Sequence, residues 1–312
     1  MLRHLLVGLL CWCSVQAAVD ESFVREAARK SGYDEAEIRH WLSQARKQDS
    51  ILKAISRPAE GKAWKDYRPI FLQRDRIEAG RAFLRQHAHA LRRAENQYGV
   101  PPEIVTAIIG VETRYGRHAG RYRVLDALYT LGFHYPRRGA FFRKQLIALF
   151  ELARKQQLDL ASLKGSYAGA MGYGQFIPTS YLAYAVDFDH DGQADLLGSV
   201  EDAIGSVAHY LARHGWQRGQ PIVRALQPPE PPPAVKARKM KPDTTLAAIV
   251  EQGFRIRGEP PPLSLPAVLL RMQGERGDLY WAAFDNFYAI TRYNHSPLYA
   301  MAVTELAHAI AR

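Results

Sequence analysis

Cysteine is nearly absent from this 312-residue chain, and its two copies, Cys11 and Cys13, both lie within the first fifteen residues. A scaffold held together by several disulfides is therefore excluded, and so is a metal site built from clustered thiolates. The fold must depend on the packing of a hydrophobic core, and a chain of this length has ample sequence to build one.

Acidic residues are also in deficit, because 31 Asp and Glu stand against 42 Lys and Arg and give a formal net charge of +11. This excess of base favours an anionic partner, which is a nucleic acid, a membrane surface or an acidic polymer. Hydrophobic residues make up 47% of the chain and charged residues 23%. These are ordinary globular values, so wholesale disorder is excluded.

The N-terminus has the layout of a secretory signal peptide. A basic start with Arg3 precedes an apolar run from Leu5 to Cys13, and small residues around Ala17 offer a cleavage site. The run is too short to span a bilayer. We expect residues 1–17 to be removed, which takes away one arginine and both cysteines and leaves a net charge of +10. Because neither cysteine follows a lipid-attachment pattern, we expect an exported product without a lipid anchor.

The spacing of apolar residues predicts a mainly helical chain. Helical periodicity extends from Glu21 to about Tyr98, and an extended or turn segment interrupts it between Pro58 and Pro69, including Trp64-Lys65-Asp66-Tyr67. A second helical block extends from Pro101 to about Trp216 and contains the motifs described below.

The composition changes after this block. Prolines in 228–233 and the basic residues that follow predict a stiff connector. Beyond it we expect a short helix over 244–252 capped by Asp243, two strands at 267–272 and 279–281, and a final helix that starts at Ser296-Pro297. The predicted class is therefore mainly α with a small β part.

One carboxylate lies on the apolar face of a predicted helix. Glu112 follows Ile104 by eight residues and Ile108 by four, so the three side chains share a face. Burial of an unpaired carboxylate is costly and would raise its pKa, as a general acid acting near neutral pH requires. The helix also ends nearby at Tyr115-Gly116, and periodicity alone supports a frayed helix end equally well.

A glycine-rich loop, 165–178, lies between two helical stretches. Its four glycines allow the backbone to approach a ligand closely, and Ser166 and Gln175 could hydrogen-bond a carboxyl group or a sugar. A tight structural connector is the commoner use of glycine. The loop follows no predicted strand and lacks a Gly-Lys-Ser ending, so a nucleotide site is excluded.

An acidic loop over 187–195 matches the calcium-loop template, with acids at positions 1, 3, 5 and 9 and glycine at position 6. The glutamate that the template requires at position 12 is replaced by Gly198, and Glu201 or Asp202 could close a longer loop. Asp202 could instead form a capping box with Ser199. The candidate calcium ligands are Asp187, Asp189, Asp191, Gln193, Asp195 and Asp202. A solvated acidic turn is the alternative.

Taken together, several segments resemble the lytic murein transglycosylase B family of bacterial cell-wall enzymes. The resemblance covers nearly the whole chain after residue 17 and is densest from Tyr98 to Trp216. The segments that match are 98–102, Gly110-Val111-Glu112-Thr113-Arg114-Tyr115-Gly116, Tyr135-Pro136-Arg137-Arg138, 165–172, Gln175-Phe176, 185–188, 202–207 and 286–296.

The resemblance implies a lysozyme-like helical core domain, an accessory helical domain and a small β domain. The expected division is a signal peptide at 1–17, a helical domain at 18–90 joined by the C-terminal helix 278–312, a catalytic core with the calcium-type loop at 91–225, and a β-containing domain at 226–277. It also implies a periplasmic monomer that binds glycan strands and stem peptides, with bound Ca²⁺, no organic cofactor and no nucleic acid. Peripheral association with a membrane stays open.

The resemblance further implies that Glu112 is the single acid/base. It would protonate the glycosidic oxygen between N-acetylmuramic acid (MurNAc) and N-acetylglucosamine (GlcNAc), then deprotonate the 6-hydroxyl of the same muramyl sugar, closing a 1,6-anhydro ring without water. Two-carboxylate glycosidases need a second acidic group for water or covalent attack. Ser166 matches the position that orients the acid. The implied groove residues are Gln175, Tyr293, Asn294, Tyr299, Arg137, Arg138 and Tyr67.

Two other functions remain possible from the sequence. A hydrolytic muramidase would share the acid but use water, and it would need a second well-placed carboxylate. A peptidoglycan-binding module without catalysis is the third possibility, and the intact motif around Glu112 argues against it.

Overall fold

The computed structural model describes residues 20–56, 61–233, 235 and 240–312. The predicted signal peptide, Pro58 and most of the basic connector lie outside these residues. The chain begins with three helices, α1 (Glu21–Ser31), α2 (Glu35–Gln44) and α3 (Asp49–Ile55). Asp34 begins α2 with a capping box, in which its side chain accepts from Glu37 N and the Glu37 carboxylate accepts from Asp34 N.

The next segment corrects one prediction. Residues 64–71 form helix α4 (Trp64–Phe71) instead of a turn, although Pro69 lies inside the helix. Trp64 and Tyr67 are three residues apart, so both rings lie on one face of α4 and are buried. Their burial holds a short helix in which a proline near the exposed end is tolerated. Helices α5 (Arg74–Gln86) and α6 (Ala88–Tyr98) follow and join at His87.

The central part of the chain is built mainly from helices around one large core. It contains α7 (Pro102–Thr113), α8 (Val124–His134), α9 (Gly139–Gln156), α10 (Pro178–Tyr184) and α11 (Val200–Arg213), with a short 3₁₀ turn at Pro136–Arg138. Two short strands, β1 (Tyr122–Arg123) and β2 (Lys164–Gly165), pair antiparallel and join the start of α8 to the glycine-rich loop. Proline at the start of α7 suits the first turn of a helix, where no backbone N–H is needed.

The β part is an antiparallel sheet with the strand order β4-β6-β7-β3-β5. Its strands are β3 (Val223–Gln227), β4 (Thr244–Thr245), β5 (Arg255–Ile256), β6 (Pro266–Gly274) and β7 (Gly277–Ala283). Helix α12 (Leu246–Glu251) begins two residues later than predicted. Its cap is Thr245 and not Asp243, because 244–245 pair with β6 as a strand and the helix can start only after them.

Alternation along β6 divides the sheet between two cores. Ala267 packs in a small second core with Leu246 and Ile249 of α12, whereas Val268 and Leu270 on the opposite face belong to the main core. The sheet extends from residue 223 to residue 283, so both of its ends lie beyond the predicted limits of 226 and 277.

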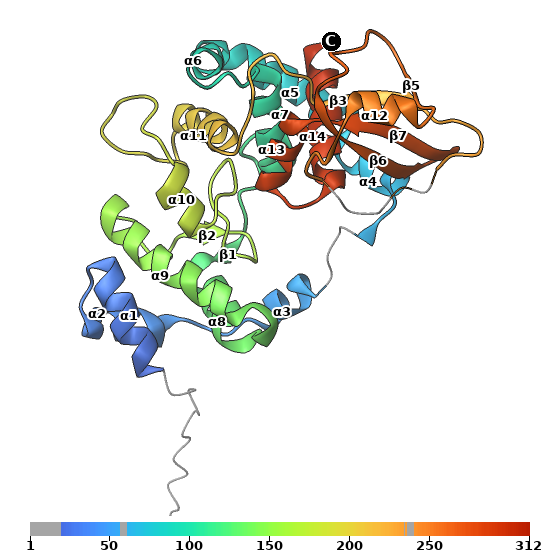
Figure 1. The fold of residues 1–312 in the computed structure, drawn as a ribbon. Coiled ribbons are helices and arrows are strands. Elements are labelled where there is room, and N and C mark those ends of the chain that lie inside the picture. The colour runs from blue at the N-terminus through green and yellow to red at the C-terminus, as the bar shows by residue number, and fades with distance from the viewer. Residues whose placement is uncertain (1–19, 57–60, 234, 236–239) are drawn as a thin grey trace, which may run out of the picture.

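The C-terminal helices are α13 (Asp285–Tyr293) and α14 (Pro297–Ala311), which starts at the predicted Ser296 cap. The segment predicted to be helical from 278 begins as β7 and becomes helical only at Asp285. Helix α14 packs against α4, α5 and α7, while α1 packs against α9 and α3 packs against α8 (Figure 1). The predicted mainly helical class with a small β part is confirmed, and the division into domains stays a prediction.

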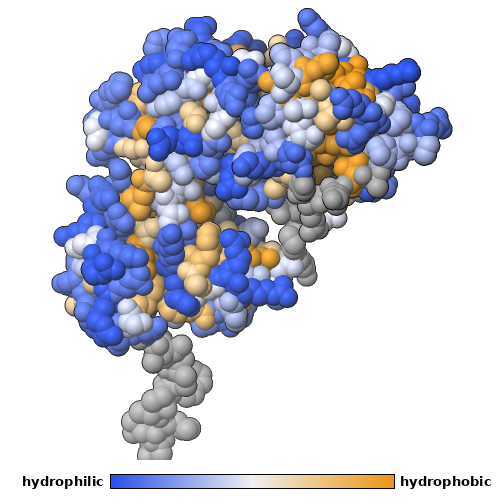
Figure 2. All heavy atoms as spheres, in the orientation of Figure 1, coloured by the Kyte–Doolittle hydropathy of each residue, from blue (hydrophilic) through white to orange (hydrophobic). Residues whose placement is uncertain are grey.

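Figure 2 shows a mostly hydrophilic surface that narrows between two halves of the molecule, with paler and apolar atoms in the narrowed region. In Figure 1 this region lies between α8 and α9 on one side and α13 and α14 on the other. A cleft of about 460 Å³ is lined by residues from α3, α9, the glycine-rich loop, α10, α11 and α13.

Candidate active site

Helix α7 positions Glu112 one residue before its C-terminal end. The helix is apolar on nearly every side, and Ile104, Val105 and Ile108 are buried in the main core. Because Glu112 shares their face, its carboxyl group is directed into the molecule. Glu112 is partly buried, so of the two alternatives left open by the spacing the structure favours the inward-facing carboxylate over an exposed, frayed helix end.

Within the described part of the chain, the carboxyl group of Glu112 has one hydrogen-bond partner. The Tyr299 hydroxyl of α14 donates to Oε1 over 2.6 Å. Burial raises the pKa of Glu112 to about 7, and the bond from Tyr299 lowers it by a smaller amount. The group is therefore a carboxylic acid for much of the time near neutral pH, with Oε2 left to bear the proton.

Two tyrosine rings connect Glu112 to the cleft. Tyr293 and Tyr299 lie nearly parallel, with an interplanar angle of 7° and ring centroids 6.5 Å apart. Tyr293 donates from its hydroxyl to Gly174 O over 2.6 Å and lines the cleft. Burial raises the pKa of both hydroxyls well above their usual value, and the nearby Glu112 adds to the shift. Both tyrosines thus stay protonated donors.

The glycine-rich loop holds its polar side chains by its own backbone. Ser166 Oγ accepts from Ala168 N and Ala170 N over 3.3 and 3.0 Å, which leaves the hydroxyl hydrogen to be donated elsewhere. Gln175 donates from Nε2 to Ala119 O and Gly172 O, both over 3.0 Å, which leaves Oε1 as an acceptor on the cleft wall. No bond from Ser166 to Glu112 is present in the described residues.

The other predicted groove residues fall into two groups. Arg138 lines the cleft, and its guanidinium lies 4.3 Å from the centroid of the Phe141 ring, while the neighbouring Arg137 is exposed. Asn294 is partly buried at the end of α13. Tyr67, by contrast, is buried beside Trp64 and is near enough to Tyr299 to add to the raised pKa of that hydroxyl.

Sequence reasoning missed Thr113, which connects Glu112 to the loop. Its buried hydroxyl contacts Tyr173 O at 3.0 Å and accepts from Gly116 N over 2.9 Å. A Cβ on Gly116 would lie 2.1 Å from the Tyr173 ring, so glycine is required there. The only sequence signal for a role of Thr113 was its position directly after Glu112. The sequence also gave no indication of Tyr210, which lines the cleft from α11, because aromatic residues on helices usually pack in the core.

The acidic loop brings three carboxylates together between α10 and α11. Oxygens of Asp187, Asp189 and Asp202 lie within 4.8 Å of one another. Carboxylate oxygens are the ligands that Ca²⁺ prefers, and a divalent cation would offset their mutual repulsion. The donor set therefore fits calcium. The other predicted ligands bond within the loop, since Asp191 accepts from Gln193 N and Asp195 accepts from Gly198 N.

The structure forms only half of the capping box predicted for Ser199 and Asp202. Ser199 caps α11 by accepting from Asp202 N over 3.2 Å, but the Asp202 carboxylate turns away from the cap. It accepts instead from the backbone of Phe188, Asp189 and Asp195. The reciprocal half of the predicted capping box is thus replaced by bonds to the loop. Burial raises the pKa of Asp202, and these backbone bonds oppose the shift.

Comparisons with known proteins identify the family of the chain. The sequence profile described as "Transglycosylase SLT domain" matches residues 15–308. The chain is 43% identical over 303 residues to "Membrane-bound lytic murein transglycosylase B" of Escherichia coli, covering 93% of this chain and 82% of that protein. Among the helices of the described residues, none has both the length and the apolar character needed to cross a bilayer.

Two solved structures extend the likeness to the fold. The E. coli lytic transglycosylase Slt35 in complex with calcium superposes with a TM-score of 0.86 at 43% identity, covering 93% of this chain and 92% of that one. SltB3 of Pseudomonas aeruginosa in complex with NAG-NAM-pentapeptide gives 0.81 at 32% identity, covering 93% and 78%. The chain therefore belongs to the transglycosylase SLT domain family, and it is a lytic transglycosylase that acts on peptidoglycan.

Proposed function

We propose that Glu112 is the single acid/base with which this enzyme cleaves the β-1,4 bond between MurNAc and GlcNAc and forms 1,6-anhydro-MurNAc. The observation that supports this role is a partly buried, desolvated carboxyl group with a pKa of about 7, bonded to Tyr299 beside a cleft. A general acid is most effective when its pKa lies near the working pH.

In the first step Glu112 Oε2–H protonates the glycosidic oxygen. The bond from that oxygen to the muramyl C1 breaks, its electron pair goes to the oxygen, and GlcNAc leaves as an alcohol. Positive charge then develops at C1, as in an oxocarbenium ion, or is taken up by the acetamido group. Glu112 is left as a carboxylate, which the Tyr299 hydroxyl stabilises by its hydrogen bond to Oε1.

In the second step the Glu112 carboxylate takes the proton of the muramyl 6-hydroxyl while O6 forms a bond to C1. The acid is regenerated, and no water is consumed. The pKa shift of Glu112 has two causes, burial and the bond from Tyr299, and no carboxylate of the described residues contributes to it. An arrangement with a single acid suits this internal attack better than the attack of an activated water.

The cleft supplies groups that would hold the sugars. Gln175 Oε1 and the Ser166 hydroxyl hydrogen offer an acceptor and a donor, and Tyr293 offers a ring on the cleft wall. We assign Arg138 and the neighbouring Arg137 to stem-peptide carboxylates, because a guanidinium fork matches a carboxylate. Asn294 and Tyr67 complete the proposed groove set.

We further propose that Asp187, Asp189 and Asp202 bind a structural Ca²⁺, with Asp191, Gln193 and Asp195 completing or bracing the loop. The Slt35 structure in complex with calcium supports this assignment. When bound, the ion would link the loop to the start of α11. The enzyme is proposed to be exported to the periplasm after loss of residues 1–17, and to consist of the helical, core and β domains described above.

Product analysis tests the mechanism. The protein lacking residues 1–17 and its Glu112→Gln variant are incubated with peptidoglycan, and the soluble muropeptides are analysed by mass. We expect anhydro-muramyl ends from the unmodified protein and at least about 10³-fold slower release from the variant. Glu103→Gln, at the other end of α7, is the matched control. Reducing ends would indicate a hydrolytic muramidase, and release unaffected by the variant would overturn the role of Glu112.

A further inference from the structure

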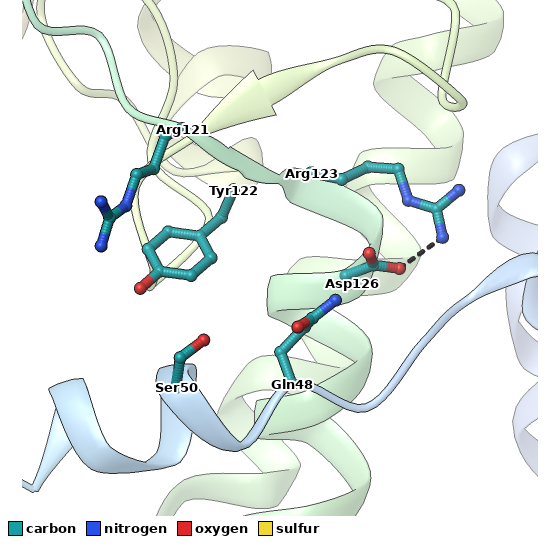
Figure 3. Close-up of a pocket in the computed structure, with 6 residues that line it drawn as sticks. All are labelled: Gln48, Ser50, Arg121, Tyr122, Arg123 and Asp126. Atoms are coloured by element: carbon teal, nitrogen blue, oxygen red, sulfur yellow. Dashed lines mark hydrogen bonds and ion pairs between the residues drawn. The ribbon is translucent and has the colours of Figure 1, made fainter.

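A second hollow lies apart from the cleft. It has a volume of about 340 Å³ and is lined by two residues at the start of α3, by β1 and the residue before it, and by the first turn of α8. Its lining residues are Gln48, Ser50, Arg121, Tyr122, Arg123 and Asp126 (Figure 3). None of them belongs to the groove set described above.

The two arginines of the hollow differ in their partners. Arg123 is held by the Asp126 carboxylate and by Gln44 O, so its charge is neutralised within the fold. Arg121 is exposed, lies 5.5 Å from the centroid of the Tyr122 ring, and forms no ion pair within the described residues. The hollow therefore contains one uncompensated positive charge, supplied by Arg121.

Neutral hydrogen-bonding groups surround this charge. The nearby Arg121 and, secondly, Ser50 lower the pKa of Tyr122, so both lie close to its hydroxyl. Figure 3 shows Arg121 and the Tyr122 hydroxyl on one side of the hollow, with Ser50 and Gln48 opposite, while Arg123 points away towards Asp126. One guanidinium with hydroxyl and amide donors matches a single carboxylate. A nucleic-acid strand would require an extended basic track.

The hollow is tied to the cleft by two elements. Tyr122 of β1 pairs with Gly165 of β2, and the chain continues directly into Ser166 and the cleft residue Tyr167. Helix α3 contributes Ser50 to the hollow and Ile55 to the cleft, and five residues of helix span roughly 8 Å along the axis. A peptide attached to a sugar in the cleft can reach this distance.

We propose that the hollow is an accessory subsite that binds a carboxylate of a peptidoglycan stem peptide while the glycan strand lies in the cleft. The inference rests on the proposed function, because it uses the same substrate. It predicts that Arg121 contributes to binding of substrates with peptides and not to the chemical step at Glu112.

Arg121→Ala tests this inference, with Arg117→Ala as the matched control because Arg117 is an exposed arginine of the same connection. Each protein is given two substrates: glycan strands with intact stem peptides, and strands from which an amidase has removed the peptides. For Arg121→Ala we expect KM to rise roughly 3- to 10-fold on the first substrate, with kcat unchanged, and no change on the second. Arg117→Ala should match the unmodified protein on both.

Two results would overturn the subsite. One is an equal change in KM on both substrates, which would mean that Arg121 holds the fold or the glycan. The other is no change on either. Cleavage of peptide-free strands by the unmodified protein tests the proposed function separately. If that cleavage fails, titration of a free stem tripeptide into Glu112→Gln and into Glu112→Gln/Arg121→Ala still tests the subsite, and equal affinity for the two proteins would refute it.

Discussion

Carboxylates occupy two contrasting settings in this protein, at Glu112 on α7 and in the loop between α10 and α11. Glu112 lies among apolar side chains with one hydroxyl partner, and burial raises its pKa to about 7. Asp189 in the loop is exposed, and a hydrogen bond from Ser199 lowers its pKa. The same functional group therefore has a raised pKa in one place and a lowered pKa in the other.

The contrast shows that the environment, and not the residue type, decides what a carboxylate does. Removal of water disfavours the charged form, whereas N–H and O–H donors favour it. Asp202 combines both influences, since burial raises its pKa while three backbone N–H groups oppose the shift. A cation bound by Asp187, Asp189 and Asp202 would favour the ionised form of Asp202.

The largest expected effect is on the stability of Glu112→Gln. The pKa of Glu112 is raised from 4.5 to about 7 on folding, so the native state binds the extra proton. The stability it contributes is complete below pH 4.5 and is lost as the pH rises through about 7. A neutral glutamine avoids this loss. The free energy of unfolding of the variant, relative to the unmodified protein, should rise by about 3 kcal/mol between pH 4 and pH 9.

Urea titrations at several pH values measure this difference, with Glu103→Gln as the control on the same helix. A difference that does not change with pH would mean that Glu112 is not desolvated.

Calcium should have the next largest effect. Saturating Ca²⁺ at about 100 times its Kd adds about 2.7 kcal/mol of stability, so the melting temperature should rise by several degrees relative to the protein in chelator. Asp202→Asn should abolish the difference, because it removes a charge from the three-carboxylate cluster. Differential scanning calorimetry measures the melting temperature with Ca²⁺ and with chelator. Asp278→Asn in the β6–β7 hairpin is the control. Equal melting temperatures with and without Ca²⁺ would contradict the site.

The hydroxyl of Tyr299 should shift the pH profile. Its hydrogen bond lowers the pKa of Glu112, so Tyr299→Phe should raise that pKa and move the alkaline limb of kcat/KM to higher pH by roughly one unit, or about 1.4 kcal/mol. Tyr293→Phe is the matched variant, because its hydroxyl bonds Gly174 O and not Glu112. Its limb should stay in place. A shift to lower pH in Tyr299→Phe would contradict the direction of the bond's effect.

The smallest effect concerns the start of α11. Ser199→Ala removes the cap and should lower the free energy of unfolding by about 1 kcal/mol. Thr245→Ala removes the corresponding cap of α12, far from the acidic loop. Chemical denaturation with and without Ca²⁺ should give similar losses for both and leave the calcium effect intact. A calcium effect lost in Ser199→Ala alone would place the Ser199 hydroxyl in the metal site.

Local patterns were sufficient for much of the fold. Prolines and caps predicted the starts of α7 and α14, because these features act within one turn of helix. Prediction failed at α4, where buried rings override Pro69, and at Thr244, where a partner strand from β6 decides the conformation. Both errors arise from contacts with residues distant in the sequence.

For the site, the sequence by itself determined that Glu112 lies on the apolar face of a helix and that acids cluster over 187–195. It did so because helical periodicity determines which side chains share a face of a helix. The acids of the loop are close neighbours in the sequence, so their clustering needs no tertiary contact. The tertiary structure alone decided the partner of the acid. Tyr299 lies 187 residues away and reaches Glu112 only because α14 packs on α7. Desolvation and this hydrogen bond, which together set the pKa, are properties of that packing.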